Sequence, residues 1–321
     1  MPNISFYSYK GGSGRTTTTL NTVFYLIREL RPTPSKPIII IDADTESYGM
    51  SMLLLRDCEK LPGIDCSLQY LALRATQDEF LSGGDSTEWL SYRKLHKYFV
   101  PVGGYFTRDV ENDAVLLLRS DVTPTEQRES WGSVFSLNNT GDKSFDNFNE
   151  LLKVLRLTKC SVVFDTPSGT QDFAELALNS SQTIVCCMRP SIQFEQGTRL
   201  CFEKFIETWR GKGAKKNIIF CPSAVPYKQI NIDSEVYPDY YMKTTYAGFR
   251  NELQTKANST NGNIEIVWDM RDGSVPGIPE VQRFKWQECC LEKVASDEED
   301  ERLAKEKYAM LARLIRSYTY N

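Results

Sequence analysis

The sequence predicts an α/β fold built on a doubly wound, mostly parallel sheet with helical insertions. Short apolar runs alternate with helical patterns along the chain, which is typical of repeated βαβ units. Ile38–Ile41 is an unbroken β-branched run, as expected for a parallel strand that is buried on both faces. Hydrophobic residues make up 41% and charged residues 25%, a globular composition that argues against wholesale disorder.

Strands are expected at the short apolar runs, and helices at longer stretches whose apolar residues recur three and four apart. In the first helix Leu20, Phe24 and Ile27 share one side, and Pro32 and Pro34 follow its end. The expected strands are Ile4–Tyr9, Ile38–Ile41, Val115–Leu118, Ser161–Phe164, Thr183–Met188, Asn217–Cys221 and Ile264–Trp268. The expected helices are Thr16–Leu30, Phe145–Leu157, Glu195–Trp209, Tyr246–Ala257 and Leu303–Tyr318.

Two stretches, about residues 57–110 and 226–245, do not follow this rhythm. The first contains helical segments around glycine pairs, and the second is rich in Tyr, Pro and Asp without periodicity. We expect both to be insertions at the edge of the sheet within a single domain that spans residues 1–321. Their aromatic residues are candidates for a partner surface or for local packing: Trp89, Tyr92, Tyr237, Tyr240 and Tyr241.

The composition argues against several classes of protein. The formal net charge is −4 and no basic tail occurs, so a uniform nucleic-acid coat is not expected. No stretch approaches the roughly 20 apolar residues of a membrane-spanning helix. The nine cysteines form no C-x-x-C pair, and one histidine, His96, is present, which argues against a zinc module or a disulfide scaffold. Free thiols and a cytoplasmic location are expected.

The segment Tyr9–Thr17 carries the chemistry, because it lies between an apolar strand and the start of a helix. Glycines let such a loop turn tightly so that backbone N–H groups converge on phosphate oxygens, and the helix N-terminus adds its dipole. Thr16 falls where a P-loop hydroxyl ligates Mg²⁺. Two residues depart from the general pattern G-x-x-x-x-G-K-[ST]: Tyr9 replaces the first glycine and Arg15 replaces the lysine.

This segment resembles the deviant Walker A motif of ParA/MinD-type ATPases, K-G-G-x-G-K-T, with its signature lysine at Lys10. Phe6–Thr16 is more similar still to a branch in which arginine replaces the P-loop lysine, the KGGVGR-motif variants. Arg15 is therefore expected to be a subfamily trait; arginine stays charged and grips phosphate oxygens in a fork, but it is bulkier than lysine. The resemblance covers roughly residues 3–56, 112–222 and 262–318.

Two further segments resemble family motifs in the family's order. Asp42–Glu46 follows its strand where the family carries the switch I motif D-x-D, and Val162–Gly169 resembles the Walker B and switch II motif D-T-P-P-G. The resemblance implies that Asp42 and Asp165 join Thr16 around Mg²⁺, and that Asp44 orients the water that attacks the γ-phosphate. A turn before a proline is the structural alternative for Asp165. The pattern G-x-G-x-x-G is absent, which disfavours a Rossmann oxidoreductase.

The resemblance assigns catalytic roles to Lys10 and Asp44. It implies that nucleotide contacts come from the loop and from two later prolines: Gly11, Gly12, Ser13, Gly14, Arg15, Thr16, Thr17, Pro222 and Pro279. Pro222 ends a late strand, and Pro279 lies in a segment similar to one that lines the base in relatives. For both prolines an ordinary loop position is an equal alternative.

The function that the resemblance implies is an ATP-dependent switch. Two subunits would enclose two ATP molecules with Mg²⁺, Lys10 would reach the partner's phosphates, and slow, partner-stimulated hydrolysis would release the homodimer. Such a switch would position or license a macromolecular partner. Three alternatives are an ATPase subunit of a bacterial defence or signalling complex, a small-molecule kinase or ligase of the dethiobiotin-synthetase type, and a module that uses ATP only as structural glue.

DNA is one candidate partner, because a basic cluster follows the helix that ends at Trp209. The cluster consists of Arg210, Lys212, Lys215 and Lys216. A solvated loop between a helix and a strand is the alternative. The last helix, Leu303–Tyr318, has an apolar face and basic residues, and packing against the sheet is favoured over membrane binding.

Overall fold

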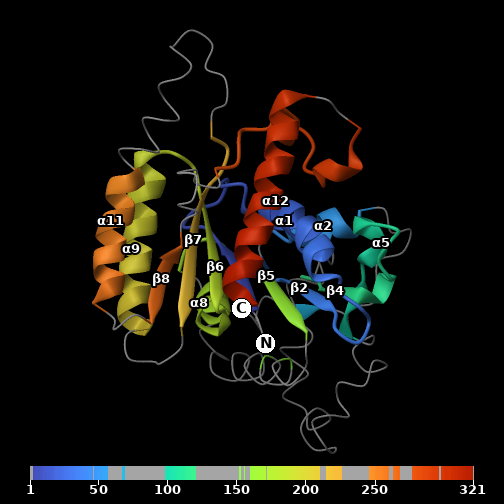
Figure 1. Ribbon diagram of the computed structural model, residues 1–321, viewed down its shortest axis with the longest axis horizontal. Coiled ribbons are helices and arrows are strands. Elements are labelled where there is room, and N and C mark those ends of the chain that lie inside the picture. Colours follow the sequence, from blue (N-terminus) through green and yellow to red (C-terminus); the bar gives the residue numbers. More distant parts are fainter. Residues whose placement is uncertain are drawn as a thin grey trace, which may run out of the picture. The chain divides into compact units, whose positions relative to one another are not determined.

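The computed structural model describes most of the chain outside the two expected insertions (Figure 1). The described residues are 3–45, 47–56, 67–68, 98–120, 152, 155, 160–170, 172–209, 215–225, 246–259, 263–267, 277–295 and 298–320. They belong to two compact units: the first unit is Pro32–Val163, and the second unit is Pro2–Arg31 with Phe164–Asn321.

The first unit is organised around β2 and β4, which run parallel with Ile38 opposite Val115. Every residue of β2 and β4 is buried, as the unbroken apolar runs predict. The two-residue strand β3 pairs antiparallel with β4 at the edge; its brevity hides it from any periodicity in the sequence. The elements of this unit are β2 (Ile38–Asp42), α2 (Gly49–Leu54), β3 (Val100–Pro101), α5 (Gly103–Phe106), a 3₁₀ turn (Asn112–Ala114), β4 (Val115–Leu118) and the first residues of β5 (Ser161–Asp165).

The second unit contains the parallel strands β1, β6, β7 and β8, which are neighbours in that order. The end of β5 lies beside β1, because Thr166 donates its N–H to the Phe6 carbonyl at 3.2 Å. The strands are β1 (Asn3–Tyr7), β6 (Thr183–Met188), β7 (Lys216–Pro222) and β8 (Ile264–Val267). The helices are α1 (Arg15–Leu30), α8 (Asp172–Ser180), α9 (Ile192–Trp209), α11 (Tyr246–Asn258) and α12 (Glu299–Thr319), and short 3₁₀ turns cover Gln282–Lys285 and Leu291–Lys293.

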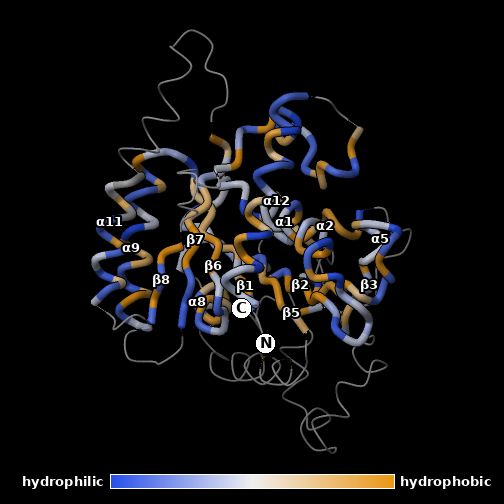
Figure 2. Tube along the Cα trace, viewed as in Figure 1, coloured by the Kyte–Doolittle hydropathy of each residue, from blue (hydrophilic) through white to orange (hydrophobic). Residues whose placement is uncertain are grey.

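Helices cover both faces of the sheet in the second unit. Alternate strand residues, such as Tyr7, Cys186 and Phe220, share one core with α8, α9 and α11. The intervening residues face α1 and α12; Thr183, for example, hydrogen-bonds the Thr319 hydroxyl at 2.7 Å. Figure 2 shows the apolar residues concentrated along β6 and β7 and polar residues along the outer sides of α9 and α11. Strands buried on both faces are what a parallel sheet requires.

The predicted fold class, a doubly wound and mostly parallel α/β sheet, is confirmed. The predicted strands and helices that fall on described residues are found with ends shifted by a few residues, and α2, α5, α8 and β3 are additions. The first strand ends at Tyr7, two residues before its predicted end. Several predicted features lie outside the described residues: the helix Phe145–Leu157 apart from Leu152 and Leu155, the basic residues Arg210 and Lys212, His96, and the aromatic residues Trp89, Tyr92, Tyr237, Tyr240 and Tyr241.

The prediction that Lys216 belongs to an exposed basic cluster is wrong, because its side chain is buried and does not face solvent. Its ammonium donates hydrogen bonds of 2.5–2.9 Å to three carbonyl oxygens at the C-terminal end of α8, those of Leu178, Asn179 and Ser181. It also lies 5.3 Å from the ring of Trp209. A cation satisfies carbonyls that a helix end leaves unpaired and complements the helix dipole, so Lys216 joins α8 to β7.

Lys216→Met is expected to lower the free energy of unfolding by about 3 kcal/mol, because it leaves buried carbonyl groups without a donor. Urea unfolding followed by circular dichroism measures the change. Lys215→Met is the matched control: Lys215 is exposed and pairs with Glu265 at 3.1 Å, and such a surface pair is worth less than about 1 kcal/mol. Equal losses in the two variants would contradict a structural role for the buried ammonium.

Candidate nucleotide site

The loop between β1 and α1 turns through two glycines in the left-handed region. Gly12 and Gly14 both have φ of 75°, a conformation that residues with a Cβ rarely adopt. A Cβ built on Gly11, Gly12 or Gly14 would meet nothing within 4 Å, so one side of the loop is open. Helix α1 begins directly after Gly14, whose carbonyl accepts the Thr18 N–H at 2.8 Å. An open glycine loop at a helix N-terminus is an arrangement that binds anions.

Contacts from distant parts of the chain hold the loop in place. Ser13 is buried, and its carbonyl accepts a hydrogen bond from the Ser223 hydroxyl at the end of β7. Gly169, which follows β5, donates its N–H to the Ser8 carbonyl at 3.0 Å. The ring of Tyr9 lies against Gly197 of α9, in the space that a Cβ on this glycine would occupy. The loop is therefore fixed by β5, β7 and α9.

Lys10 is exposed and lies at the outer side of the loop. Its ammonium donates to Gln193 Oε1, in the first turn of α9, at 3.4 Å. Thr16 is half-buried in the first turn of α1, and Thr17 is buried. These residues come together at the start of α1, as the spacing of the motif requires.

The Arg15 side chain takes a direction that the motif alone does not reveal. Its Nε donates to Asp165 Oδ1 at 2.8 Å, and the two side chains are 7% and 0% exposed. The Thr19 hydroxyl donates to the same oxygen at 3.4 Å, and Arg15 Nη1 lies 3.5 Å from the Ser8 hydroxyl. The P-loop arginine and the Walker B aspartate of the predicted site thus form a buried ion pair.

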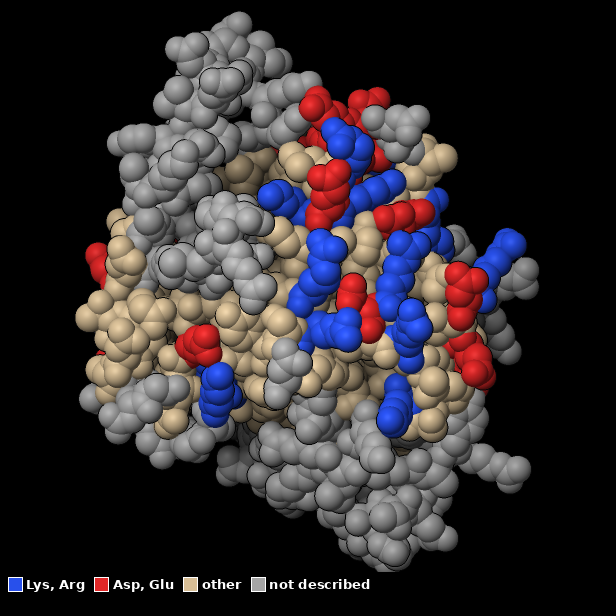
Figure 3. Space-filling model, viewed as in Figure 1, with Lys and Arg blue, Asp and Glu red and all other residues tan. Residues whose placement is uncertain are grey.

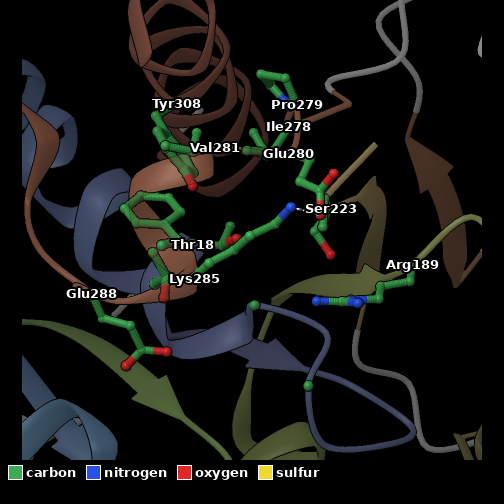
Figure 4. Close-up of a pocket in the computed structure, with 15 residues that line it drawn as sticks. Thr18, Arg189, Ser223, Ile278, Pro279, Glu280, Val281, Lys285, Glu288 and Tyr308 are labelled. Atoms are coloured by element: carbon green, nitrogen blue, oxygen red, sulfur yellow. Dashed lines mark ion pairs between the residues drawn. The ribbon is translucent and has the colours of Figure 1, made fainter. Parts of the chain in front are cut away.

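A pocket of about 200 Å³ lies beside the loop in the second unit. Its lining comes from the loop, the ends of β6 and β7, the segment 278–288 and α12: Gly12, Gly14, Thr17, Thr18, Arg189, Ser223, Ala224, Ile278, Pro279, Glu280, Val281, Phe284, Lys285, Glu288 and Tyr308 (Figure 4). Pro279, a predicted nucleotide neighbour, lines this pocket. Pro222, the last residue of β7, is not among the described residues that line the pocket, whereas Ser223 is. The Pro222 carbonyl accepts a hydrogen bond from the Ile278 N–H at 2.7 Å.

The charged residues of this pocket were not predicted. Arg189 extends from the end of β6 toward it, and Lys285 reaches across it to within 3.6 Å of Glu280 (Figure 4). Burial, and secondarily Asp165, raises the pKa of Glu288. The sequence position of Arg189 is a signal that could have identified it as a site residue. It directly follows a predicted strand, and ligands of open α/β sheets bind at the carboxyl ends of strands.

Side chains of α1 hold the segment that carries Lys285 and Glu288, among them Tyr25, whose hydroxyl donates to Glu292 Oε1. Asn21 donates to the Cys289 carbonyl at 3.0 Å and accepts the Leu291 N–H at 2.8 Å. These contacts join residues about 270 positions apart in the sequence, so no local pattern predicts them.

Asp42 and Asp44 belong to the first unit, where both carboxylates hold neighbouring backbone. Asp42 is fully buried and its Oδ2 accepts the Ser51 N–H at 2.8 Å and the Ser51 hydroxyl at 2.6 Å. Asp44 accepts the Ser47 hydroxyl at 2.7 Å and the Ser47 N–H at 3.2 Å. These contacts fix the turn after β2 and the start of α2.

The donor atoms at the loop suit Mg²⁺ bound together with a nucleotide. Among the described residues no cluster of three or more His, Cys, Asp or Glu exists that could hold a metal ion by itself. Mg²⁺ usually takes one or two carboxylates and completes its shell with phosphates and water. The Thr16 hydroxyl and the Asp165 carboxylate are oxygen donors of this kind, and in this structure the Asp165 charge is compensated by Arg15.

Neither a protein-family model nor a curated protein matches the sequence. Solved structures match over nearly the whole chain. An ATP complex of a McdA variant from Cyanothece is 12% identical with a TM-score of 0.58, covering 99% of this chain and 96% of that one. MinD from Pyrococcus horikoshii with Mg-ADP is 15% identical with a TM-score of 0.53, covering 97% and 94%. Cobyrinic acid a,c-diamide synthase from Mycobacterium smegmatis, with a bound ATP analogue and magnesium, is 11% identical with a TM-score of 0.56, covering 99% and 95%. At these identities the likeness shows a shared fold.

Proposed function

The chain has the fold of the ParA/MinD-type P-loop ATPases, and on that premise we propose that it is an ATP-binding and ATP-hydrolysing switch that dimerises around the nucleotide. One observation carries the proposal: two left-handed glycines open the N-terminus of α1 and also line a pocket whose far wall contains Pro279. Phosphates would lie at the loop and the nucleoside in the pocket. The similar McdA structure holds ATP, the MinD structure holds Mg-ADP, and the diamide synthase structure holds an ATP analogue with magnesium.

The loop and the start of α1 supply positive potential for the phosphates. Backbone N–H groups at the helix N-terminus point toward an anion bound there, and the helix dipole adds to the attraction. Arg189 extends toward the same pocket and adds a side-chain cation. Thr16 and Asp165 would hold Mg²⁺, which when bound neutralises phosphate charge. Asp42 is the further carboxylate that we propose for this ion.

Lys10 and Asp44 are proposed to act on the reacting phosphate. Lys10 is exposed, and among the described residues its ammonium contacts a neutral amide, Gln193 Oε1, at 3.4 Å, so it can reach a second subunit without breaking an ion pair. There it would stabilise charge that develops on the transferred phosphoryl group. Asp44 is held by Ser47 at the end of β2 and would orient the attacking water.

The burial of apolar residues and the distribution of surface charge in the second unit bear on which kind of partner the switch controls. The apolar residues of α12, among them Tyr308, Leu311 and Ile315, are buried, as expected of a helix face that packs on the protein. Figure 3 shows Lys and Arg side chains interspersed with Asp and Glu on one face of the molecule. Basic residues of α12 pair with acidic ones: Arg302 lies 3.2 Å from Glu306, and Arg316 lies 2.7 Å from Glu29. None of the described helices is long and apolar enough to cross a membrane.

DNA remains a proposed partner, but fewer residues of the basic cluster are available to contact it. Lys216 is buried and Lys215 pairs with Glu265, so the described part of the basic cluster offers one exposed ammonium. Arg210 and Lys212 complete the proposed contact. A macromolecular partner that recognises the ATP-bound dimer is therefore the more general form of the proposal, and a defence or signalling complex would use the same switch.

Molar mass measured by light scattering tests the proposed switch. With Mg²⁺ and ATP, or a slowly hydrolysed analogue, the mass is expected to double from the 36.7 kDa of one chain, and with ADP or no nucleotide it is expected to stay there. ATP favours the dimer because its γ-phosphate makes contacts that exist only between two subunits.

A mass that does not depend on nucleotide, in a protein that binds ATP, would contradict the switch. The fold is shared with cobyrinic acid a,c-diamide synthase, so a small-molecule kinase or ligase would then be the better proposal. No binding of ATP or ADP at all would contradict the nucleotide site itself.

A further inference from the structure

Arg15 and Asp165 form an ion pair that lies beneath the P-loop. The 2.8 Å contact joins the first residue of α1 to the last residue of β5, and both side chains are buried. Cys187 of β6 lies next to the pair: burial raises its pKa to about 12, while Arg15 lowers it and Asp165 raises it. The guanidinium therefore lies in the interior, between the ends of the strands.

The pair directs Arg15 away from the place where phosphates would bind. The pocket is lined by Gly12, Gly14, Thr17 and Thr18 from this segment, and Arg15 is not among the described lining residues. To contact a phosphate the guanidinium must leave Asp165. A buried carboxylate that loses its cation is strongly disfavoured, because it exchanges a charge partner for a medium of low polarity.

A nucleotide that arrives with Mg²⁺ avoids this cost. Arg15 can transfer from Asp165 to a phosphate while the metal ion compensates Asp165, so every buried charge keeps a partner of opposite sign. A nucleotide that arrives alone attracts Arg15 and so takes from Asp165 the cation that pairs with it at 2.8 Å. The two ligands are therefore energetically coupled through one side chain.

We infer that the Arg15–Asp165 pair makes nucleotide binding conditional on Mg²⁺, because Arg15 moves from Asp165 to the phosphates only when a second cation takes its place. The inference rests on the nucleotide-binding part of the proposed function and is independent of hydrolysis and dimerisation. It gives the arginine of this loop a role that a P-loop lysine directed at phosphate would not have.

A double-mutant cycle on nucleotide affinity tests the inference. Binding of fluorescent mant-ADP is titrated in EDTA and in Mg²⁺ for the parent, D165N, R15Q and R15Q/D165N. In EDTA, D165N is expected to bind about tenfold tighter than the parent, because Arg15 can then leave without exposing a buried charge. In the R15Q background the D165N substitution is expected to bring no gain.

A matched variant separates the pair from general electrostatics. E288Q removes another acidic charge that lines the same pocket and lies near Asp165, and any gain it gives in EDTA should be the same with or without Arg15. Equal D165N gains in the Arg15 and R15Q backgrounds, or no gain in either, would overturn the inference while the parent's binding in Mg²⁺ upheld the nucleotide site. A parent that does not bind mant-ADP even with Mg²⁺ would overturn both.

A measurement on the parent protein covers the case in which a variant does not fold. With ¹⁵N-arginine labelling, the Arg15 Nε–H, assigned by its absence in R15K, should be protected from solvent exchange without ligand, since it donates to buried Asp165. Addition of Mg²⁺ and ADP together should shift this signal, and ADP in EDTA should leave it in place up to concentrations at which the Mg²⁺ complex is saturated. A signal that is unchanged by saturating Mg²⁺ and ADP would overturn the inference.

Discussion

Lys10→Ala is expected to abolish ATP-driven dimerisation while leaving the fold and nucleotide binding intact. The side chain is exposed and its ammonium contacts Gln193 Oε1 at the outer limit of hydrogen-bond distance, 3.4 Å, so its removal costs the monomer little. In the dimer the same ammonium would be the group that crosses to the partner's phosphates, where a desolvated charge pair is worth several kcal/mol. Light scattering with Mg²⁺ and ATP measures dimerisation, and unfolding in urea measures the stability of the fold.

Lys204→Ala is the matched control for this experiment, because Lys204 is another exposed lysine, on α9 of the same unit. It should dimerise like the parent. Dimerisation of Lys10→Ala at the parent's ATP concentration would show that the lysine does not act across the interface, and a parallel loss in Lys204→Ala would show a nonspecific effect of surface charge.

Gly197→Ala is expected to weaken nucleotide binding by about tenfold or more, although the residue lies on α9 and not in the loop. An added Cβ would lie 2.0, 2.3 and 2.5 Å from three ring atoms of Tyr9, so the ring must move. Tyr9 directly precedes Lys10 and the glycines, and its displacement changes the position of the loop. Overpacking of this kind also costs about 1–3 kcal/mol of stability. Titration with mant-ADP in Mg²⁺ and urea unfolding measure the two effects.

Two further variants show whether the loss passes through the Tyr9 ring. Removing the ring in Tyr9→Ala/Gly197→Ala should restore a large part of the affinity that Gly197→Ala loses relative to Tyr9→Ala. Gly248→Ala is the matched control, since a Cβ there meets nothing within 4 Å in α11 and alanine favours helices. If Gly197→Ala binds nucleotide like the parent, the contact between α9 and the loop does not position the site.

Local pattern was sufficient for much of the fold. The run Ile38–Ile41 predicts a strand buried on both faces, and β2 is buried at every residue. The spacing of Leu20, Phe24 and Ile27 predicts α1, and all three are buried. These predictions succeed because hydrophobic period and helix geometry act over a few residues. The short strand β3 and helix α8 lack a period long enough to be recognised.

Local pattern also located the loop but not the direction of its side chains. Two glycines before a helix predict a tight turn, and Gly12 and Gly14 adopt the left-handed conformation that only glycine accepts readily. The expectation for Arg15 was a phosphate contact, and its partner is Asp165, 150 residues away in sequence. Whether a long charged side chain points into a loop or beneath it depends on which buried charge lies within reach.

By itself the sequence determined which segments are strands and helices, where the glycine loop lies, and that its chemistry suits phosphates. The tertiary structure alone decided which residues form the rest of the site. Ser223 holds Ser13, Asn21 fixes the segment that carries Lys285 and Glu288, and Lys216 is buried at the end of α8. Each of these contacts joins residues tens to hundreds of positions apart. Their energies depend on burial and on the satisfaction of polar groups, which exist only once the strands have been brought side by side.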